Sequence, residues 1–182
     1  MIKWRNDKLN RLNADELLEL VDVAVASDID EPENAPLREA FINQIHNFYQ
    51  RDGVIVIRGF YRGSLVASGF IIPSKTSGVF KLNPGRIKEL EKSINTSIDR
   101  VYVPAYIYLH PKLRGKGYGK RLADYTNEVA KSNGFEYLSL YGYHNTVSHS
   151  FYTHGYELIK TGVEGASSID REDLLNILYA KL

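Results

Sequence analysis

The hydrophobic residues in the first part of the chain recur every three or four positions, which is the spacing of amphipathic helices. The first such segment covers residues 14–26, and Asn13 followed by Glu16 is typical of a capping box at a helix start. Its expected apolar face contains Leu17, Leu18, Val21 and Val25. After a polar, acidic connector, residues 36–50 predict a second helix, because Pro36 suits a first helical turn.

From residue 54 onward the hydrophobic spacing falls to two, which is typical of strands. Residues 54–60 and 64–72 flank a glycine-containing turn and predict a β-hairpin. A short helix is expected at residues 86–93. Residues 101–109 alternate again, which places two sets of side chains on opposite faces. One face is expected to carry Val103, Ala105, Ile107 and Leu109, and the other Tyr102, Tyr106 and Tyr108.

The second half predicts a parallel crossover unit, in which strand 101–109, a glycine-rich turn and a helix at 120–133 lead to strand 137–141. Three further elements are predicted after it, a short helix and two closing strands, at residues 145–154, 156–160 and 176–182. Together these elements indicate an α/β (α+β) fold with a central mixed β-sheet of about six to seven strands flanked by helices on both faces. The length of 182 residues suits a single domain, residues 1–182.

Composition narrows the classes of function. The net charge of +1 is small for a protein that coats nucleic acid. Cysteine is absent, which excludes disulfide scaffolds, thiolate zinc sites and cysteine nucleophiles. No apolar run follows the basic residues near residue 1, and none approaches the roughly 20 residues of a membrane span. We therefore expect a cytoplasmic protein without a membrane partner.

A basic, glycine-rich window carries the clearest chemical signal. Residues 111–121 contain no acid and five basic side chains, at Lys112, Arg114, Lys116, Lys120 and Arg121. Three glycines alternate within it, at positions 115, 117 and 119, and allow the backbone to approach a ligand closely. The N-terminus of the following helix adds unpaired N–H groups and partial positive charge. This combination predicts a cradle for a diphosphate, the alternative being a plain tight turn.

Two common nucleotide motifs do not match this window. A phosphate loop of nucleoside triphosphatases requires Ser or Thr after the lysine, and Arg121 occupies that position. The dinucleotide fingerprint requires unequal glycine spacing, whereas the glycines here are two residues apart throughout. Both motifs can therefore be set aside.

The sequence Arg114-Gly115-Lys116-Gly117-Tyr118-Gly119 resembles the R/Q-x-x-G-x-G/A motif of the GNAT superfamily of N-acetyltransferases. The flanking residues 108–113 and 120–122 are similar to that family, as is the later stretch from Asn145 to Tyr156. The resemblance is strongest over residues 101–160, and the order of helices, hairpin and final strand before and after it agrees with the layout of a GNAT-like sheet.

The resemblance implies acetyl transfer from acetyl-CoA to an amine. In the family, backbone N–H groups of the glycine loop bind the CoA diphosphate. The corresponding residues here are Arg114, Gly115, Lys116, Gly117, Tyr118 and Gly119, together with Lys120. The strand end at Leu109 would pair with the pantetheine arm, and its N–H would polarise the thioester carbonyl as an oxyanion donor does.

Two residues near the end of the resembling region are implied in contacts with the cofactor. Asn145 matches an asparagine that touches pantetheine, and an ordinary helix N-cap is the alternative. Tyr152 matches the tyrosine that protonates the departing thiolate, since a phenol can give a proton within hydrogen-bond reach. The alternative for Tyr152 is a core aromatic, because the chain has 13 tyrosines.

The general base is left open by the sequence, because residues 101–109 contain no carboxylate. Asp99, His110 and His144 are candidates, and relayed water is another; of the histidines His144 is preferred. His110 precedes a proline at a strand end, where a turn residue is the simpler interpretation. The histidines are too scattered to indicate a metal site, so coenzyme A is the only cofactor expected.

These observations favour an N-acetyltransferase that acts by direct attack of a primary amine in a ternary complex. The acceptor, a small molecule or a protein, is not specified by the sequence. Relatives of this kind are often homodimers, but the oligomeric state is open. A non-catalytic acyl-CoA sensor on the same fold is the main alternative. An RNA-binding module using the basic window is a third, against which the low net charge argues.

Overall fold

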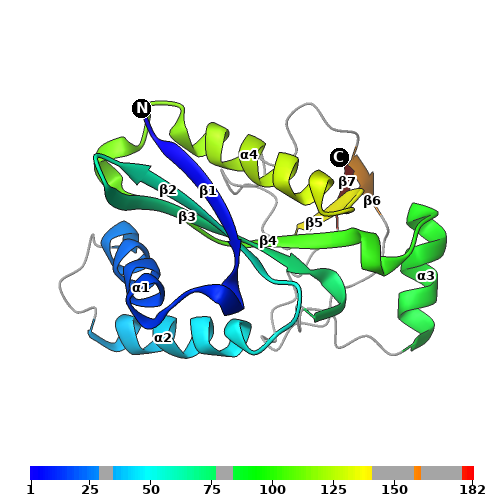
Figure 1. Cartoon of the computed structure of the whole chain (residues 1–182). Coiled ribbons are helices and arrows are strands. Elements are labelled where there is room, and N and C mark those ends of the chain that lie inside the picture. Colours follow the sequence, from blue (N-terminus) through cyan, green and yellow to red (C-terminus); the bar gives the residue numbers. More distant parts are fainter. Residues whose placement is uncertain (29–34, 77–83, 141–157, 161–177) are drawn as a thin grey trace. The chain divides into compact units, whose positions relative to one another are not determined.

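A computed structural model describes residues 1–28, 35–76, 84–140, 158–160 and 178–182. The chain divides into two compact units, residues 1–71 with 105–126 and residues 72–104 with 127–182. With two compact units in the chain, the single domain expected from the sequence stays a prediction. Figure 1 shows the elements along the chain.

The sheet of the first unit is built around an antiparallel hairpin. Strands β2 (Ile55–Tyr61) and β3 (Ser64–Pro73) pair antiparallel, as the hairpin prediction requires. Strand β4 (Val101–Leu109) is the next neighbour of β3, and the His110 N–H donates to the Val66 carbonyl at 2.9 Å. The bounds of all three strands agree with the predicted segments to within a residue.

Strand β1 (Lys3–Lys8) precedes the first predicted segment and pairs antiparallel with the other edge of β2. Its only aromatic residue, Trp4, stacks on Tyr125 with ring centroids 6.1 Å apart. Gly59 makes room for that indole, because a Cβ at this glycine would lie 2.5 Å from Trp4 Cζ3. The strand is largely polar, so it lacks the alternating apolar pattern by which strands are recognised.

Helices cover both faces of this sheet. Helices α1 (Ala14–Asp28) and α2 (Ala35–Tyr49) match the two predicted helices. They lie on the face where Phe48 of α2 contacts Phe70 and Tyr106, with ring centroids 6.3 and 5.1 Å apart. Helix α4 (Tyr118–Ser132) lies on the opposite face, where a Cβ on Gly69 would be 3.7 Å from Leu122 Cδ1.

The alternation of β4 differs from the prediction, and placing Tyr102 on the face of Tyr106 and Tyr108 is wrong. Tyr102 is fully buried and its hydroxyl donates to Asn127 of α4, whereas Tyr106 and Tyr108 contact α2. Tyr106 has a φ of 51°, in the left-handed region. A residue in this conformation shifts the alternation of a strand by one position, as a β-bulge does.

The second unit contains helix α3 (Pro84–Ile94) and the strands β5 (Tyr137–Leu140), β6 (Leu158–Lys160) and β7 (Leu178–Lys181). β5 pairs parallel with β4 at Val101 and Tyr102, which confirms the predicted crossover through α4. β7 pairs antiparallel with both β5 and β6. Short 3-10 turns join the elements of the chain, at Leu9–Arg11, Ser74–Thr76, Ile98–Arg100 and Pro111–Leu113.

The mixed sheet with flanking helices is confirmed as the fold class, while the number of strands in one sheet stays a prediction. The predicted helix at 145–154 lies outside the described residues. None of the helices in the described part of the chain combines the length and the apolar character that crossing a membrane requires.

Candidate functional site

The glycine loop between β4 and α4 has an open, left-handed backbone. Gly115 and Gly117 have φ angles of 71° and 76°, which are strained for any residue with a side chain. A Cβ at either position would meet no atom within 4 Å. Among the described residues, conformation and not crowding is therefore the reason for glycine at these two positions.

The backbone donors of this loop can be assigned one by one. The Arg114 N–H is already bonded to the Pro111 carbonyl at 3.0 Å. The first turn of α4 closes with the Arg121 N–H on the Gly117 carbonyl at 3.2 Å. The N–H groups of Tyr118, Gly119 and Lys120 precede that bond and have no acceptor within the helix. The available donors thus run from Gly115 to Lys120, at the positive end of the helix dipole.

The basic side chains of the window surround this backbone and contact protein oxygens. Lys116 Nζ donates to the Lys112 carbonyl at 2.8 Å, and Lys120 Nζ pairs with Asp124 at 2.8 Å. The guanidinium of Arg121 lies over the Tyr118 ring, 5.9 Å from its centroid. These groups are exposed or partly exposed and keep the loop positively charged, while Asp124 offsets one charge at its edge.

The end of β4 offers a second set of backbone groups. Neighbouring residues of a strand direct their N–H and C=O groups to opposite sides. Because the His110 N–H points to β3, the N–H and C=O of Leu109 point to the other side. On that side the ladder with β5 is described only at Val101 and Tyr102. Among the described residues, the Leu109 carbonyl on that side accepts from Arg114 Nε at 3.3 Å, so the Leu109 N–H is the group there that could meet an extended ligand.

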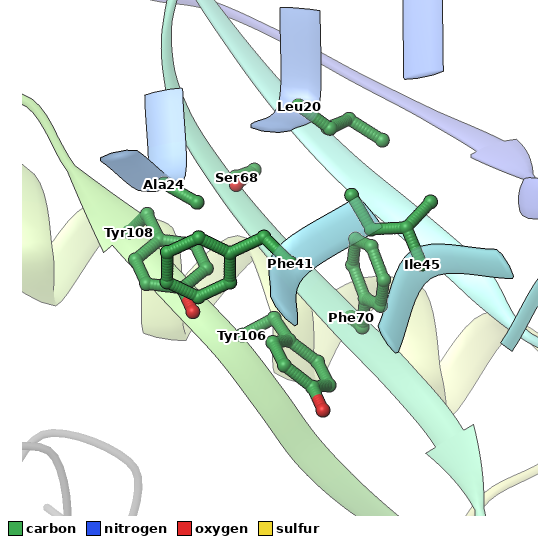
Figure 2. A pocket seen from close by; sticks show the side chains of 8 residues that line it. All are labelled: Leu20, Ala24, Phe41, Ile45, Ser68, Phe70, Tyr106 and Tyr108. Atoms are coloured by element: carbon green, nitrogen blue, oxygen red, sulfur yellow. The ribbon is translucent and has the colours of Figure 1, made fainter. Parts of the chain in front are cut away.

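A small apolar cavity, which the sequence did not predict, lies between helices α1 and α2 and strands β3 and β4. Figure 2 shows side chains converging on it from four elements: Leu20 and Ala24 of α1, Phe41 and Ile45 of α2, Ser68 and Phe70 of β3, and Tyr106 and Tyr108 of β4. Its volume is about 10 Å³, which suffices for one water molecule. Burial raises the pKa of the Tyr106 phenol above its ordinary value, so this phenol is neutral at pH 7.

The remaining predicted residues divide into described and undescribed ones. His144, Asn145 and Tyr152 lie outside the described residues. His110 caps the turn Pro111–Leu113 by accepting from the Lys112 N–H at 3.3 Å, in agreement with the turn interpretation. Asp99 is exposed and pairs with Lys75 at 3.2 Å. Within the described ranges, no cluster of three or more histidine, aspartate or glutamate side chains could hold a metal ion.

Several solved structures with a similar fold are acetyltransferases. The PaiA N-acetyltransferase of Thermoplasma acidophilum, crystallised with coenzyme A, is 18% identical and has a TM-score of 0.57, with 100% of this chain and 99% of that chain covered. An acetyltransferase of Staphylococcus aureus is 14% identical and has a TM-score of 0.59, with 100% of this chain and 99% of that chain covered. An acetyltransferase of Streptococcus agalactiae is 19% identical and has a TM-score of 0.58, with 100% of this chain and 98% of that chain covered.

At these identities the structural likeness establishes the fold alone, and no curated protein sequence matches this chain. The family comparison goes further. The profile described as "Acetyltransferase (GNAT) family" matches residues 25–156, which is well over half of the sequence and includes the glycine loop. The chain therefore belongs to the acetyltransferase (GNAT) family.

Proposed function

We propose that this protein is an N-acetyltransferase that transfers the acetyl group of acetyl-CoA to a primary amine. The observation that carries the proposal is the open glycine loop, whose left-handed residues Gly115 and Gly117 lead directly into the N-terminus of α4. This arrangement suits a diphosphate, because several N–H groups and the helix dipole favour the same anion. Membership of an acetyltransferase family makes coenzyme A the fitting diphosphate.

The cofactor would use two parts of the chain described above. The diphosphate would accept hydrogen bonds from the N–H groups of residues 115–120, with the charges of Lys116 and Lys120 nearby. The pantetheine arm would extend along the edge of β4 at Leu109 that faces away from β3. The Leu109 N–H would then donate to the thioester carbonyl and stabilise the negative charge that develops on its oxygen.

The chemical step follows from these positions and from the absence of cysteine. The neutral amine nitrogen attacks the thioester carbon, the N–C bond forms and the C–S bond breaks. Since no thiol is present to carry an acyl group, the transfer occurs directly within a ternary complex. We assign the proton for the departing thiolate to Tyr152, and removal of the ammonium proton to His144 or to water. Asn145 is proposed to contact the pantetheine arm.

The acceptor would approach from the side of α1 and α2. The cavity between these helices and the Tyr106–Tyr108 segment of β4 has an apolar wall next to the strand that would hold the thioester. Its lining contains no charged side chain. An amine-bearing small molecule or protein is the proposed acceptor, and it would meet the thioester beside this strand rather than inside the water-sized cavity.

A screen of primary amines with acetyl-CoA, read out as released free thiol, tests the proposal. Substituting Tyr152→Phe should lower turnover on the order of 10²-fold or more without weakening coenzyme A binding. Tyr61→Phe is the matched control, because the Tyr61 ring packs against Arg62 at the β2–β3 turn and should keep full turnover.

The main alternative function, a non-catalytic acyl-CoA sensor, predicts a different result. A sensor would bind coenzyme A in calorimetry but release no thiol with any amine, and Tyr152→Phe would have no activity to change. That combination would replace the transferase proposal with the sensor. Release of thiol that is insensitive to Tyr152→Phe would keep the transferase and remove Tyr152 from the mechanism.

A further inference from the structure

Arg114 begins the glycine loop, but its polar groups are directed to other parts of the protein. Its Nε donates to the Leu109 carbonyl at 3.3 Å, and its terminal NH2 group donates to the Ser27 carbonyl in the last turn of α1. Its own N–H is held by the Pro111 carbonyl. We propose that Arg114 is a positioning residue that couples occupancy of the glycine loop to the placement of helix α1. This inference rests on the proposed function, since it requires a ligand in the loop.

The C-terminal end of α1 needs such a partner. The last carbonyls of a helix have no N–H partner within it and carry partial negative charge. The first turn of α1 contains the acids Asp15 and Glu16, which suit the positive end of the helix dipole. The last turn contains no basic residue to match its negative end. The nearby Ser27 hydroxyl is buried and donates to the Val23 carbonyl at 2.7 Å, so it cannot serve the Ser27 carbonyl. The guanidinium of Arg114 supplies a cation and an N–H donor at this end of the helix.

The side chain suits this role because one planar group reaches two acceptors. A guanidinium presents several N–H groups in a fixed fork, whereas a lysine ammonium is a single, more flexible point charge. Through this fork Arg114 connects the end of α1 with the end of β4, directly next to Gly115. The backbone that would close around a diphosphate is thus one residue away from an anchor on α1.

The consequence concerns the apolar cavity of Figure 2. Leu20 and Ala24 of α1 form one side of that cavity, and both lie within two turns of Ser27. Fixing the end of α1 therefore fixes the wall opposite Tyr106 and Tyr108. Coenzyme A in the glycine loop would therefore also order the packing of α1 around this water-sized cavity.

Hydrogen–deuterium exchange on the full chain, with and without coenzyme A, tests the coupling without knowledge of the acceptor. In the wild-type protein, coenzyme A should slow exchange of the amides at residues 20–28 by roughly fivefold, the lower end of typical coupling between sites. In Arg114→Met that protection should disappear. Coenzyme A is added to saturation for each protein, as judged by calorimetry, so that a change in its affinity does not enter the comparison.

Lys112→Met is the matched control, because Lys112 is an exposed member of the same basic window and its loss changes the net charge equally. This variant should retain the protection of α1. Arg114→Lys keeps the charge but not the fork and should recover less than half of the protection. Equal protection in wild type and Arg114→Met, or none in wild type, overturns the coupling. Failure of wild type to bind coenzyme A overturns the proposed function as well.

Discussion

Gly117 and Gly63 both have a φ in the left-handed region, but only Gly117 lies in the proposed site. Their φ angles are 76° and 87°, and a Cβ on either would meet no atom within 4 Å. A side chain at Gly117 should therefore cost about 1–2 kcal/mol of unfolding free energy through backbone strain alone. Gly117→Ala should also weaken coenzyme A binding at least about tenfold, because N–H groups turned toward the diphosphate change direction.

Gly63→Ala separates these two effects. Gly63 lies in the β2–β3 turn, so its substitution should cost similar stability in urea unfolding but leave coenzyme A affinity unchanged in calorimetry. Coenzyme A affinity that is unchanged from wild type in both variants would contradict a diphosphate site at Gly117. Equal loss in both would attribute the effect to general destabilisation.

The start of helix α1 joins local capping with a long-range ion-pair network. The Asn13 N–H donates to Glu16 Oε2 and the Glu16 N–H to Asn13 Oδ1, both at 3.0 Å, which confirms the predicted capping box. Arg58 of β2, with a side chain only 6% exposed, donates to Glu16 at 2.7 Å and to Asp7 at 2.6 Å. The element is therefore held to β1 and β2 through one guanidinium.

This network gives the fold a dependence on pH. The hydrogen bond from Arg58, followed by that from the Asn13 backbone, holds the pKa of the Glu16 carboxyl below its ordinary value. In the unfolded chain the Glu16 carboxyl therefore binds its proton more tightly than in the folded protein. The contribution of ionised Glu16 to the unfolding free energy is complete at neutral pH. It is lost as the pH falls below about 4.3, the unfolded-state pKa, and through the lower pKa of the folded state. Glu16→Gln keeps the capping box but should lower unfolding free energy at pH 7, with the difference from wild type shrinking on acidification.

Urea unfolding between pH 7 and pH 3 measures that difference. Glu19→Gln is the control, because Glu19 is an exposed carboxylate on the same helix and its substitution should alter stability little at any pH. A Glu16→Gln difference that persists unchanged at pH 3 would mean that packing or capping, and not the charge, accounts for the effect.

The elements differ in how far their sequences predict them, and the reason is the range of the forces involved. Helices α1 and α2 follow from local hydrophobic spacing and capping residues. Strand β1 does not, because its pairing with β2 depends on a distant partner and its side chains are mostly polar. The change in side-chain alternation along β4 at Tyr106 also depends on distant residues. Tyr102 must bond to Asn127 of α4, whereas Tyr106 must pack against Phe48 of α2.

The same distinction holds for the site across the molecule. The glycine loop is continuous in sequence, so its glycines, charges and following helix could be read together. The cavity at Tyr106 and Tyr108 gathers side chains from four separate elements, and the Arg114–Ser27 contact joins residues 87 positions apart. No short motif encodes such contacts, because they arise only when α1 packs on the sheet.

At the scale of the whole protein, the low net charge and the local basic window predict how ligands stabilise the fold. A ligand that binds only the folded state at 100 times its Kd should raise unfolding free energy by about 2.7 kcal/mol. Coenzyme A should therefore raise Tm with concentration, whereas pantetheine, which lacks the diphosphate, should have a much smaller effect.

A chain of net charge +1 has little long-range attraction for a polyanion, so added RNA should neither raise Tm nor bind with a steep salt dependence. Thermal unfolding with each of the three ligands at low and moderate salt compares them directly. Stabilisation by RNA that exceeds that of coenzyme A and collapses with salt would assign the basic window to nucleic acid and remove it from acetyl transfer.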